Sequence, residues 1–117
     1  MVKSLSSLRS LNVEDNEIGQ EGATAIALGM AHEMAKLEVL NIAQNTIMDE
    51  GGIALAKALG TNGTLKSLNI GANGLGPSFA KTLSTSLTNN STLTELNIGI
   101  RGYLIKACSI LRLLLMS

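Results

Sequence analysis

The sequence predicts an α/β solenoid, in which strand-helix units repeat along the chain and share one core. Two observations indicate this fold class. A motif of leucines and an asparagine recurs at spacings of 29, 28 and 28 residues, and each copy joins a short stretch of period two to a longer stretch with helical periodicity. The 117 residues suffice for one domain, and 45% hydrophobic against 15% charged residues argue against disorder.

The repeated motif is LxxLNΦ, where Φ is an aliphatic residue. Its four copies lie at residues 8–13, 37–42, 65–70 and 93–98. In the first three copies a second asparagine and a further aliphatic residue follow, which extends the motif to LxxLNΦxxNxΦ. The second asparagines are Asn16, Asn45 and Asn73. Three near-complete copies in register indicate a true repeat and not a coincidence of leucines.

The first half of each copy predicts a short strand. Leu40 and Ile42 alternate with Asn41, so the two aliphatic side chains share one face of the strand. Strands are therefore expected near residues 11–13, 40–42, 68–70 and 96–98. Stacking these strands predicts two buried columns, which consist of Leu11, Leu40, Leu68 and Leu96 and of Val13, Ile42, Ile70 and Ile98.

The second half of each copy predicts a helix. Apolar or small residues recur at helical spacing, which predicts helices near residues 21–35, 50–60 and 78–89. The predicted inward positions are Ala23, Ile26, Ala27, Met30 and Met34, then Gly52, Leu55, Ala56 and Leu59, then Ala80, Leu83, Ser84 and Leu87. Pro77 suits the first turn of the third helix. One such unit cannot bury its apolar faces alone, so neighbouring units must stack.

The pattern LxxLNΦxxNxΦG followed by GAxAΦA, read in residues 8–27, resembles the ribonuclease-inhibitor-like leucine-rich repeat family. The alanine-rich helices are similar to those of the cytosolic NOD-like receptors. The resemblance covers about residues 4–98. It implies a partial horseshoe with parallel strands on the concave side and helices on the convex side. It also implies that Asn16, Asn45 and Asn73 form an inward ladder that satisfies backbone groups.

The pattern breaks at the C-terminal end, where Arg101 and Tyr103 replace the ladder asparagine and the aliphatic residue. Residues 1–100 are therefore expected to hold three full repeats and the strand of a fourth, and residues 101–117 a divergent, apolar tail. The repeat phase would place Cys108 inward on a final helix over about residues 103–115. This tail could cap the core, serve as a contact for self-association, or be a misread terminus.

Composition and motifs disfavour several functional classes. The nine basic and nine acidic residues leave no net charge, so neither nucleic acid nor an anionic membrane is expected as a partner. No membrane span is expected either, because the apolar tail is too short to cross a bilayer. The single Cys and His cannot form a zinc site. The glycine order in residues 71–76 differs from that of nucleotide-binding loops, and no nucleophile can be placed beside His32. We therefore expect no catalytic site, cofactor or metal.

Two further sequence features concern location and modification. The start lacks a basic segment followed by an apolar one, so a cytoplasmic location is expected. Asn62, Asn89 and Asn90 lie in N-glycosylation sequons. Their Asn-x-Thr-Leu pattern recurs in phase before two strands, so a role in the linker explains two of them better than glycosylation.

The predicted function is a non-catalytic protein-protein interaction module, used for scaffolding or ligand sensing. Strand alternation places four sets of residues on the concave face: 10, 12, 14 and 15; 39, 41, 43 and 44; 67, 69, 71 and 72; and 95, 97, 99 and 100. The candidate partner-binding residues among them are Asn12, Glu14, Asp15, Asn41, Gln44, Asn69, Glu95 and Asn97. These positions hold no Trp, Tyr or Arg, the usual hot spots, so weak or avid binding of a protein partner is expected. The asparagine column could bind a partner's backbone or remain solvated.

Two alternative functions remain open. The repeats also resemble those of the GTPase-activating protein of the Ran GTPase, which would imply a regulator of a small GTPase, although the loops offer acids, glycines and Gln44 where a basic residue would be needed. The chain could also be an incomplete fragment of a larger repeat protein.

The charges are distributed unevenly along the sequence. Residues 1–50 hold eight acidic and three basic residues, and residues 51–117 hold one acidic and six basic residues. The difference could steer head-to-tail association or be chance drift.

Overall fold

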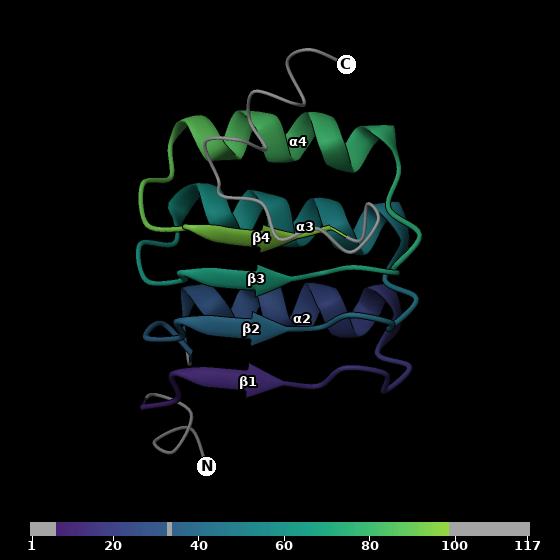
Figure 1. Ribbon diagram of the computed structural model, residues 1–117, viewed down its shortest axis with the longest axis horizontal. Coiled ribbons are helices and arrows are strands. Elements are labelled where there is room, and N and C mark those ends of the chain that lie inside the picture. Colours follow the sequence, from purple (N-terminus) through teal and green to yellow (C-terminus); the bar gives the residue numbers. More distant parts are fainter. Residues whose placement is uncertain (1–6, 33, 99–117) are drawn as a thin grey trace.

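The computed structural model describes residues 7–32 and 34–98, which form one sheet backed by three helices (Figure 1). The elements are β1 (Ser10–Asn12), α2 (Gly19–Ala31), β2 (Val39–Asn41), α3 (Met48–Thr61), β3 (Ser67–Asn69), α4 (Pro77–Thr88) and β4 (Glu95–Asn97). The strands are parallel and follow one another in sequence order. The predicted solenoid of alternating strands and helices is therefore confirmed.

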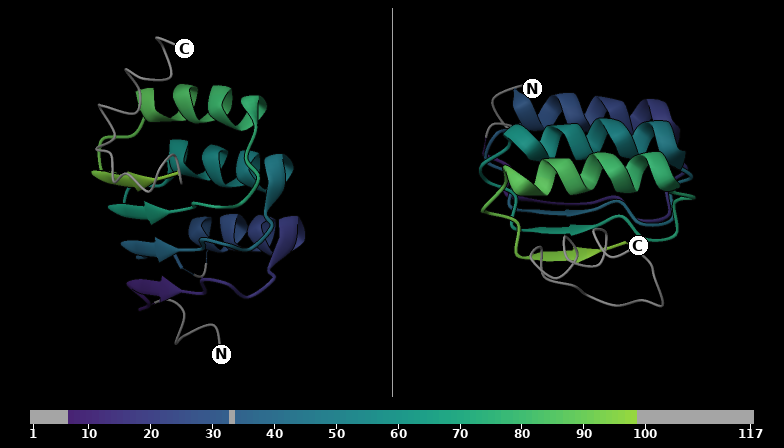
Figure 2. Two further views of the ribbon diagram at one scale, coloured as in Figure 1. Left: turned by 45° about the vertical axis from the view of Figure 1, so that its right-hand side comes forward. Right: turned by 90° about the horizontal axis from the view of Figure 1, so that it is seen from above.

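The molecule has two layers, one of strands and one of helices. Figure 2 shows the three helices side by side on one side of the sheet, which leaves the other side of the strands without a covering helix among the described residues. The register aligns the motif copies, with Leu11, Leu40, Leu68 and Leu96 opposite one another in adjacent strands. The sheet remains open, with β1 and β4 at its edges.

Each strand begins and ends one residue earlier than predicted. Val13, Ile42 and Ile70 lie just outside the strands, although their N–H groups still donate to the carbonyls of Asn41, Asn69 and Asn97 at 2.8–2.9 Å. The N–H of Val39 donates in turn to the Arg9 carbonyl at 2.9 Å, which extends the pairing at the other end. The predicted pairing was correct, and only the assigned ends shift.

The two predicted core columns are buried at their centre and partly exposed at their ends. Leu40, Leu68 and Leu96 are at most 2% exposed, and Ile42 and Ile70 are fully buried. Leu11, Val13 and Ile98 are only partly buried and pack against the margin of the core. Leu11, Val13 and Ile98, in the first and last motif copies, are thus less buried than the same positions in the middle copies, whereas Leu96 of the last copy is buried as well.

The first predicted helix was too long at its C-terminal end. Helix α2 ends at Ala31, and the N–H groups of His32 and Met34 both donate to the Gly29 carbonyl. This turn folds Met34 back over the helix, where a Cβ atom on residue 29 would overlap the Met34 Cε atom. Met34 is buried as predicted, but by a reversal of the chain and not by a fourth helical turn.

The second helix presents the predicted face, and the third is rotated slightly from it. Gly52, Leu55, Ala56 and Leu59 of α3 are all buried. In α4 the buried residues are Phe79, Leu83, Ser86 and Leu87, whereas Ala80 and Ser84 are only partly buried, contrary to the prediction. Phe79 lies against Gly52, where an added Cβ atom would come within 2.8 Å of the phenyl ring. The bulk of Phe79 takes the inward position that Ala80 was expected to hold.

Helix α4 is capped by the repeat before it. Its N-cap residue, Gly76, has no side chain to cap the helix. Asp49, in the first turn of α3, supplies the missing acceptor, because its Oδ1 atom accepts the N–H of Gly76 at 3.0 Å and that of Phe79 at 2.8 Å. The cap therefore also joins two neighbouring repeats.

Several predictions fall on residues that the structure does not describe. They concern the concave positions Gly99 and Ile100, the boundary at residue 100, and the tail over residues 101–117 with Cys108 and its helix. In the part of the chain that is described, no helix is long and apolar enough to cross a membrane.

Candidate functional site

The candidate site is the side of the sheet that faces away from the helices, the face toward the viewer in Figure 1. We call it the concave face, and it comprises the predicted positions on the strands and the turns after them. Asn12, Glu14, Asp15, Gln44 and Glu95 are exposed, and Asn41, Asn69 and Asn97 are partly buried. All eight predicted partner-binding residues thus lie on the concave face or at its margin.

Two residues predicted on this face do not contribute exposed side chains. Ala43 is 5% exposed, and Gly71 is buried. Ala43 and Gly71 occupy the position that Glu14 holds in the first repeat, two residues after the strand asparagine. Their small size leaves them below the level of the longer neighbouring side chains, so strand alternation alone overestimated their exposure.

The strand asparagines form a column of amides with a common orientation. The Oδ1 atoms of Asn12, Asn41 and Asn69 each accept the N–H group two residues further on, from Glu14, Ala43 and Gly71, at 3.1 Å. A backbone N–H requires an acceptor, so this bond fixes the oxygen toward the turn. The Nδ2 groups remain as the hydrogen-bond donors of the column.

Glu14 occupies two of the donors on the concave face. Its Oε1 atom accepts from Nδ2 of Asn41 at 2.8 Å, and its Oε2 atom accepts from Nε2 of Gln44 at 3.2 Å. The amides of β2 and its following turn thus hold a carboxylate that comes from the neighbouring repeat. We call this arrangement the Glu14 clamp.

The predicted asparagine ladder is present below the concave face at Asn45 and Asn73, whereas Asn16 is exposed and its side-chain amide donates only to the carbonyls of its own turn. Asn45 Oδ1 accepts the N–H groups of Asn16 and Ile18, and its Nδ2 donates to the carbonyls of Val13, Ile42 and Ala43. Asn73 repeats the pattern one repeat later, with the N–H groups of Asn45 and Ile47 as donors. Asn45 and Asn73 are at most 3% exposed. These asparagines are structural, because every bond serves the turn backbone.

A second asparagine ladder lies at the starts of the strands, where the chain returns from helix to strand. Asn62 Nδ2 donates to the Met30 carbonyl at 3.4 Å, and Asn90 Nδ2 donates to the Leu59 carbonyl at 2.7 Å. Their Oδ1 atoms accept N–H groups of their own turns, from Leu65 and Leu93 among others. The sequence showed this recurrence as overlapping sequons, and the linker role inferred for Asn62 and Asn90 is confirmed.

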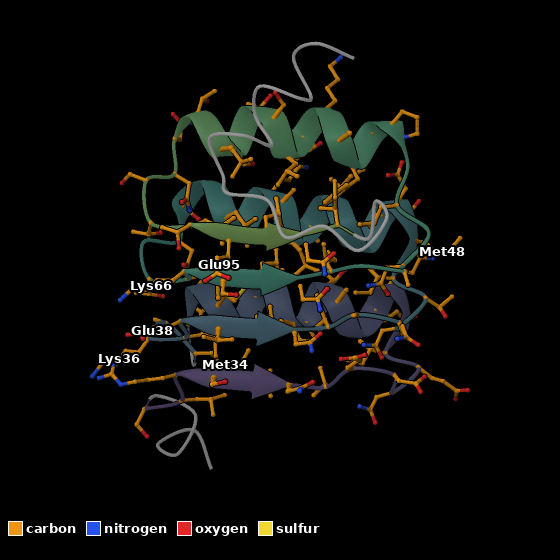
Figure 3. All side chains as sticks on the ribbon, in the orientation of Figure 1. Met34, Lys36, Glu38, Met48, Lys66 and Glu95 are labelled. Carbon is orange, nitrogen blue, oxygen red and sulfur yellow. The ribbon has the colours of Figure 1, made fainter. Side chains whose placement is uncertain are left out.

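The charges also differ between the loops at the ends of the strands and the loops at their starts. We call the loops that follow the strands, residues 13–20, 42–50 and 70–78, the strand-end rim. This rim carries Glu14, Asp15, Glu17, Asp49 and Glu50 and no lysine or arginine. At the strand starts, Figure 3 shows Lys36, Glu38, Lys66 and Glu95 gathered together, opposite Met48 at the strand-end rim.

The side of the sheet where the strands start carries both acidic and basic residues. An exposed ion pair joins Arg9 Nη1 to Glu38 Oε2 at 3.1 Å. Such a pair contributes little to stability, because water screens it. Five acids of the first half of the sequence therefore lie on the strand-end rim, and all of them belong to the first two repeats, toward the β1 end of the solenoid.

The sequence features that suggested chemistry have structural explanations. The carbonyl groups of Gly71 and Asn73 accept backbone N–H groups of the preceding repeat, from Gln44 and Met48. Gly71 thus belongs to the ladder of turns and not to a phosphate-binding loop. His32 is exposed at the end of α2. No group of three metal-ligating side chains occurs among residues 7–32 and 34–98.

A shallow groove on the convex side runs between α3 and α4. It is lined by Lys57, Thr61, Lys81, Thr82, Thr85 and Asn89, among others. The hydroxyls of Thr61, Thr82 and Thr85 donate to carbonyls of their own helices. Because the hydroxyl protons are already used within the helices, the groove is an ordinary solvated helix surface.

Comparison with known families agrees with this architecture. The family model described as Leucine Rich repeat matches residues 4–27 and 33–56. Each matched segment contains one motif copy and most of the helix that follows it, to residue 27 in α2 and to residue 56 in α3. No curated protein matches the chain significantly. The matches support a leucine-rich repeat family, and the four in-register parallel strands that alternate with helices form an open sheet consistent with a partial solenoid of such repeats.

Proposed function

We propose that the chain is a non-catalytic protein-protein interaction module that scaffolds or senses a protein partner through its concave face. The observation that carries this proposal is the open face of the sheet. One side of each strand is buried against the helices, whereas the other presents polar side chains that the core does not use. Leucine-rich repeats suggest such a module, and the family is typically non-enzymatic.

Within this proposal the repeats are of the ribonuclease-inhibitor-like type, similar to those of NOD-like receptors. Two features support this finer assignment. Each repeat has a helix of 12 to 14 residues on the side opposite the sheet, and successive ladder asparagines are bonded at separations of 29 and 28 residues.

Regulation of a small GTPase is a weaker alternative. Such a role needs a polar or basic side chain that can reach from a strand-to-helix loop into the partner's active site. Gln44 is the neutral candidate in these loops, and its amide donates to Glu14. The strand-end rim supplies no arginine or lysine. The interaction module therefore explains the surface better.

We expect the affinity for one partner domain to be modest. The eight partner-binding residues comprise asparagines, acids and one glutamine, and none is an aromatic residue or an arginine. Hot spots are usually Trp, Tyr or Arg in desolvated pockets. Tight binding would need several such contacts or several copies of the module, because linked sites gain from effective concentration.

The proposal can be tested by selecting protein fragments that bind the chain and measuring their binding to a chain substituted on the concave face. Protein fragments selected for binding to the full chain would be measured against Asn41→Ala/Asn69→Ala, which alters the centre of the concave face. Lys57→Ala/Lys81→Ala serves as the control on the convex groove. Binding should be lost in the first variant and kept in the second. Selected fragments that bind the first variant as well as the unaltered chain would refute the concave face as the binding surface.

A further inference from the structure

Asn41 and Asn69 occupy equivalent places on the concave face but differ in the availability of their donors. Both use Oδ1 to accept the N–H two residues further on, at 3.1 Å. Asn41 Nδ2 donates to Glu14 at 2.8 Å. Asn69 Nδ2 has no hydrogen-bond partner among the described residues. The amide of Asn69 is thus an unused donor at the centre of the sheet.

The donor remains unused because the Glu14 clamp is not repeated. In the next repeat Ala43 stands where Glu14 stands in the first, and Ala72 stands where Gln44 stands in the second. The Ala43 methyl group cannot accept a hydrogen bond from Asn69 as Glu14 accepts one from Asn41. The Ala72 methyl group cannot donate to an acceptor beside Asn69 as Gln44 donates to Glu14. Ala43, Gly71 and Ala72 instead leave a surface of small residues, which allows the backbone of another chain to come close.

Charge decides which kind of acceptor fits this place. Adjacent strands lie about 4.8 Å apart, so the site on β3 is one strand from Glu95 and two strands from Glu14. Both acids are exposed, and none of the concave positions described carries a basic residue; the nearest one is Lys66, which precedes β3 and lies near Glu95 at the strand starts. A partner's carboxylate would be repelled there, whereas a main-chain carbonyl would not. Basic side chains next to that carbonyl would be attracted by the two acids.

Resting on the proposed function, we propose that Asn69 binds a main-chain carbonyl of an extended, basic segment of a protein partner. The segment crosses the strands with its lysine or arginine side chains beside Glu14 and Glu95. The small side chains of Ala43, Gly71 and Ala72 admit its backbone. The Glu14 clamp closes the equivalent place on β2, so β3 is the point of contact.

Blocked ten-residue peptides of alternating sequence serve as probes on the full chain. A lysine-threonine peptide should bind and should shift the side-chain amide resonances of Asn69 in NMR spectra. A glutamate-threonine peptide should do neither. Because the attraction is electrostatic, raising the salt concentration should weaken binding of the lysine-threonine peptide.

Asn41→Ala is compared with Asn69→Ala because both variants lose one bond to a turn N–H, and Asn41→Ala loses its bond to Glu14 in addition. Lys57→Ala/Lys81→Ala on the convex groove remains the control that should leave binding unchanged. Asn69→Ala should weaken binding of the lysine-threonine peptide about tenfold, which corresponds to 1.4 kcal/mol. Asn41→Ala should weaken it less than twofold, since its donor is already used by Glu14. Asn69→Asp keeps an acceptor for the Gly71 N–H, removes the donor and adds a negative charge, so an uncharged glutamine-threonine peptide is the probe for the loss of the donor, and its binding should weaken.

Three results would overturn the inference: absence of binding by the lysine-threonine peptide, binding of the glutamate-threonine peptide with equal strength, or equal losses in Asn41→Ala and Asn69→Ala. None of these results refutes the proposed function if the selected fragments no longer bind the double variant Asn41→Ala/Asn69→Ala. Selected fragments that bind the double variant as well as the unaltered chain would refute the proposed function itself, regardless of the peptide results.

Discussion

The first and second repeats carry the same motif and yet differ in how firmly that motif is held. In the second repeat Leu40, Ile42 and Asn45 are at most 1% exposed. In the first, the equivalent residues Leu11 and Val13 are partly buried, and Asn16 is exposed. The hydrogen bonds differ in the same sense, because Asn45 accepts the N–H groups of Asn16 and Ile18 from the repeat before it.

The comparison teaches that a motif residue is stabilised by the repeats beside it and not by the motif itself. The first copy has a neighbouring repeat on one side only, and its Leu11 is less buried than Leu40, which lies between two repeats. The stability of a solenoid is accordingly a sum of repeat and interface contributions. Substitutions at equivalent positions should therefore differ in effect, and the following variants test that difference from the largest effect to the smallest.

The largest difference is expected between Leu68→Ala and Leu11→Ala. Leu68 is 2% exposed in β3, so its truncation should lower the free energy of unfolding by about 2–5 kcal/mol. Leu11 is already partly exposed, and its truncation should cost about 1 kcal/mol, since less apolar area is lost. Denaturant unfolding of both variants measures the difference. An unchanged thermal midpoint in Leu68→Ala would contradict the core assignment.

The next comparison is between ladder asparagines. Asn45→Ala removes bonds to two N–H groups and three carbonyls around a fully buried side chain. Leaving such groups without partners should cost about 3 kcal/mol. Asn16→Ala removes bonds to two carbonyls that are near water, and about 1 kcal/mol is expected. Equal losses in calorimetry would mean that burial does not decide the strength of the ladder.

A smaller effect is expected from the cap that joins two repeats. Asp49→Ala should lower the free energy of unfolding by about 0.5–2 kcal/mol, because the N–H groups of Gly76 and Phe79 lose their acceptor. Gln20 holds the equivalent place at the start of α2, and Gln20→Ala is the control. A control loss as large as that of Asp49→Ala would show that general helix propensity, and not the cap, is responsible.

The smallest expected effect is a gain. Met48 has φ of 62°, in the left-handed region, where Gly19 stands in the first repeat with φ of 70°. Met48→Gly relieves about 1–2 kcal/mol of backbone strain but adds about 0.5–1 kcal/mol of chain entropy to the unfolded state. A rise of about 0.5 kcal/mol in the free energy of unfolding is therefore expected. A lower thermal midpoint would show that Met48 contacts outweigh the strain.

Most of the fold could be predicted from the sequence, because each position of the repeat can be compared with the equivalent positions in the other copies. Leu40 and Leu68 could be assigned to one column since they share a place in the motif, and parallel in-register strands followed. The ends of elements were less accurate. Nothing in residues 31–35 indicates that Met34 turns back over Gly29, because the cause is the space above a glycine in the preceding helix turn.

The candidate site was predicted by position and not by interaction. Alternation placed Asn41 and Asn69 on one face, but it could not show that Glu14 occupies the first and leaves the second open. Asp49 was likewise missed as a cap, since the helix that it caps lies one repeat further on. Such contacts join residues about 28 apart, and their choice depends on which of several nearby side chains reaches the acceptor.

Native-state hydrogen exchange tests the central claim that neighbouring repeats stabilise the motif. The N–H of Asn16 donates to Asn45 Oδ1 and the N–H of Asn45 donates to Asn73 Oδ1, both at 2.7 Å. The two amides thus make the same bond in two repeats and differ in the burial of their surroundings. Much stronger protection is expected for Asn45, because opening there must disrupt both adjacent repeats. Equal protection of the two amides would contradict it.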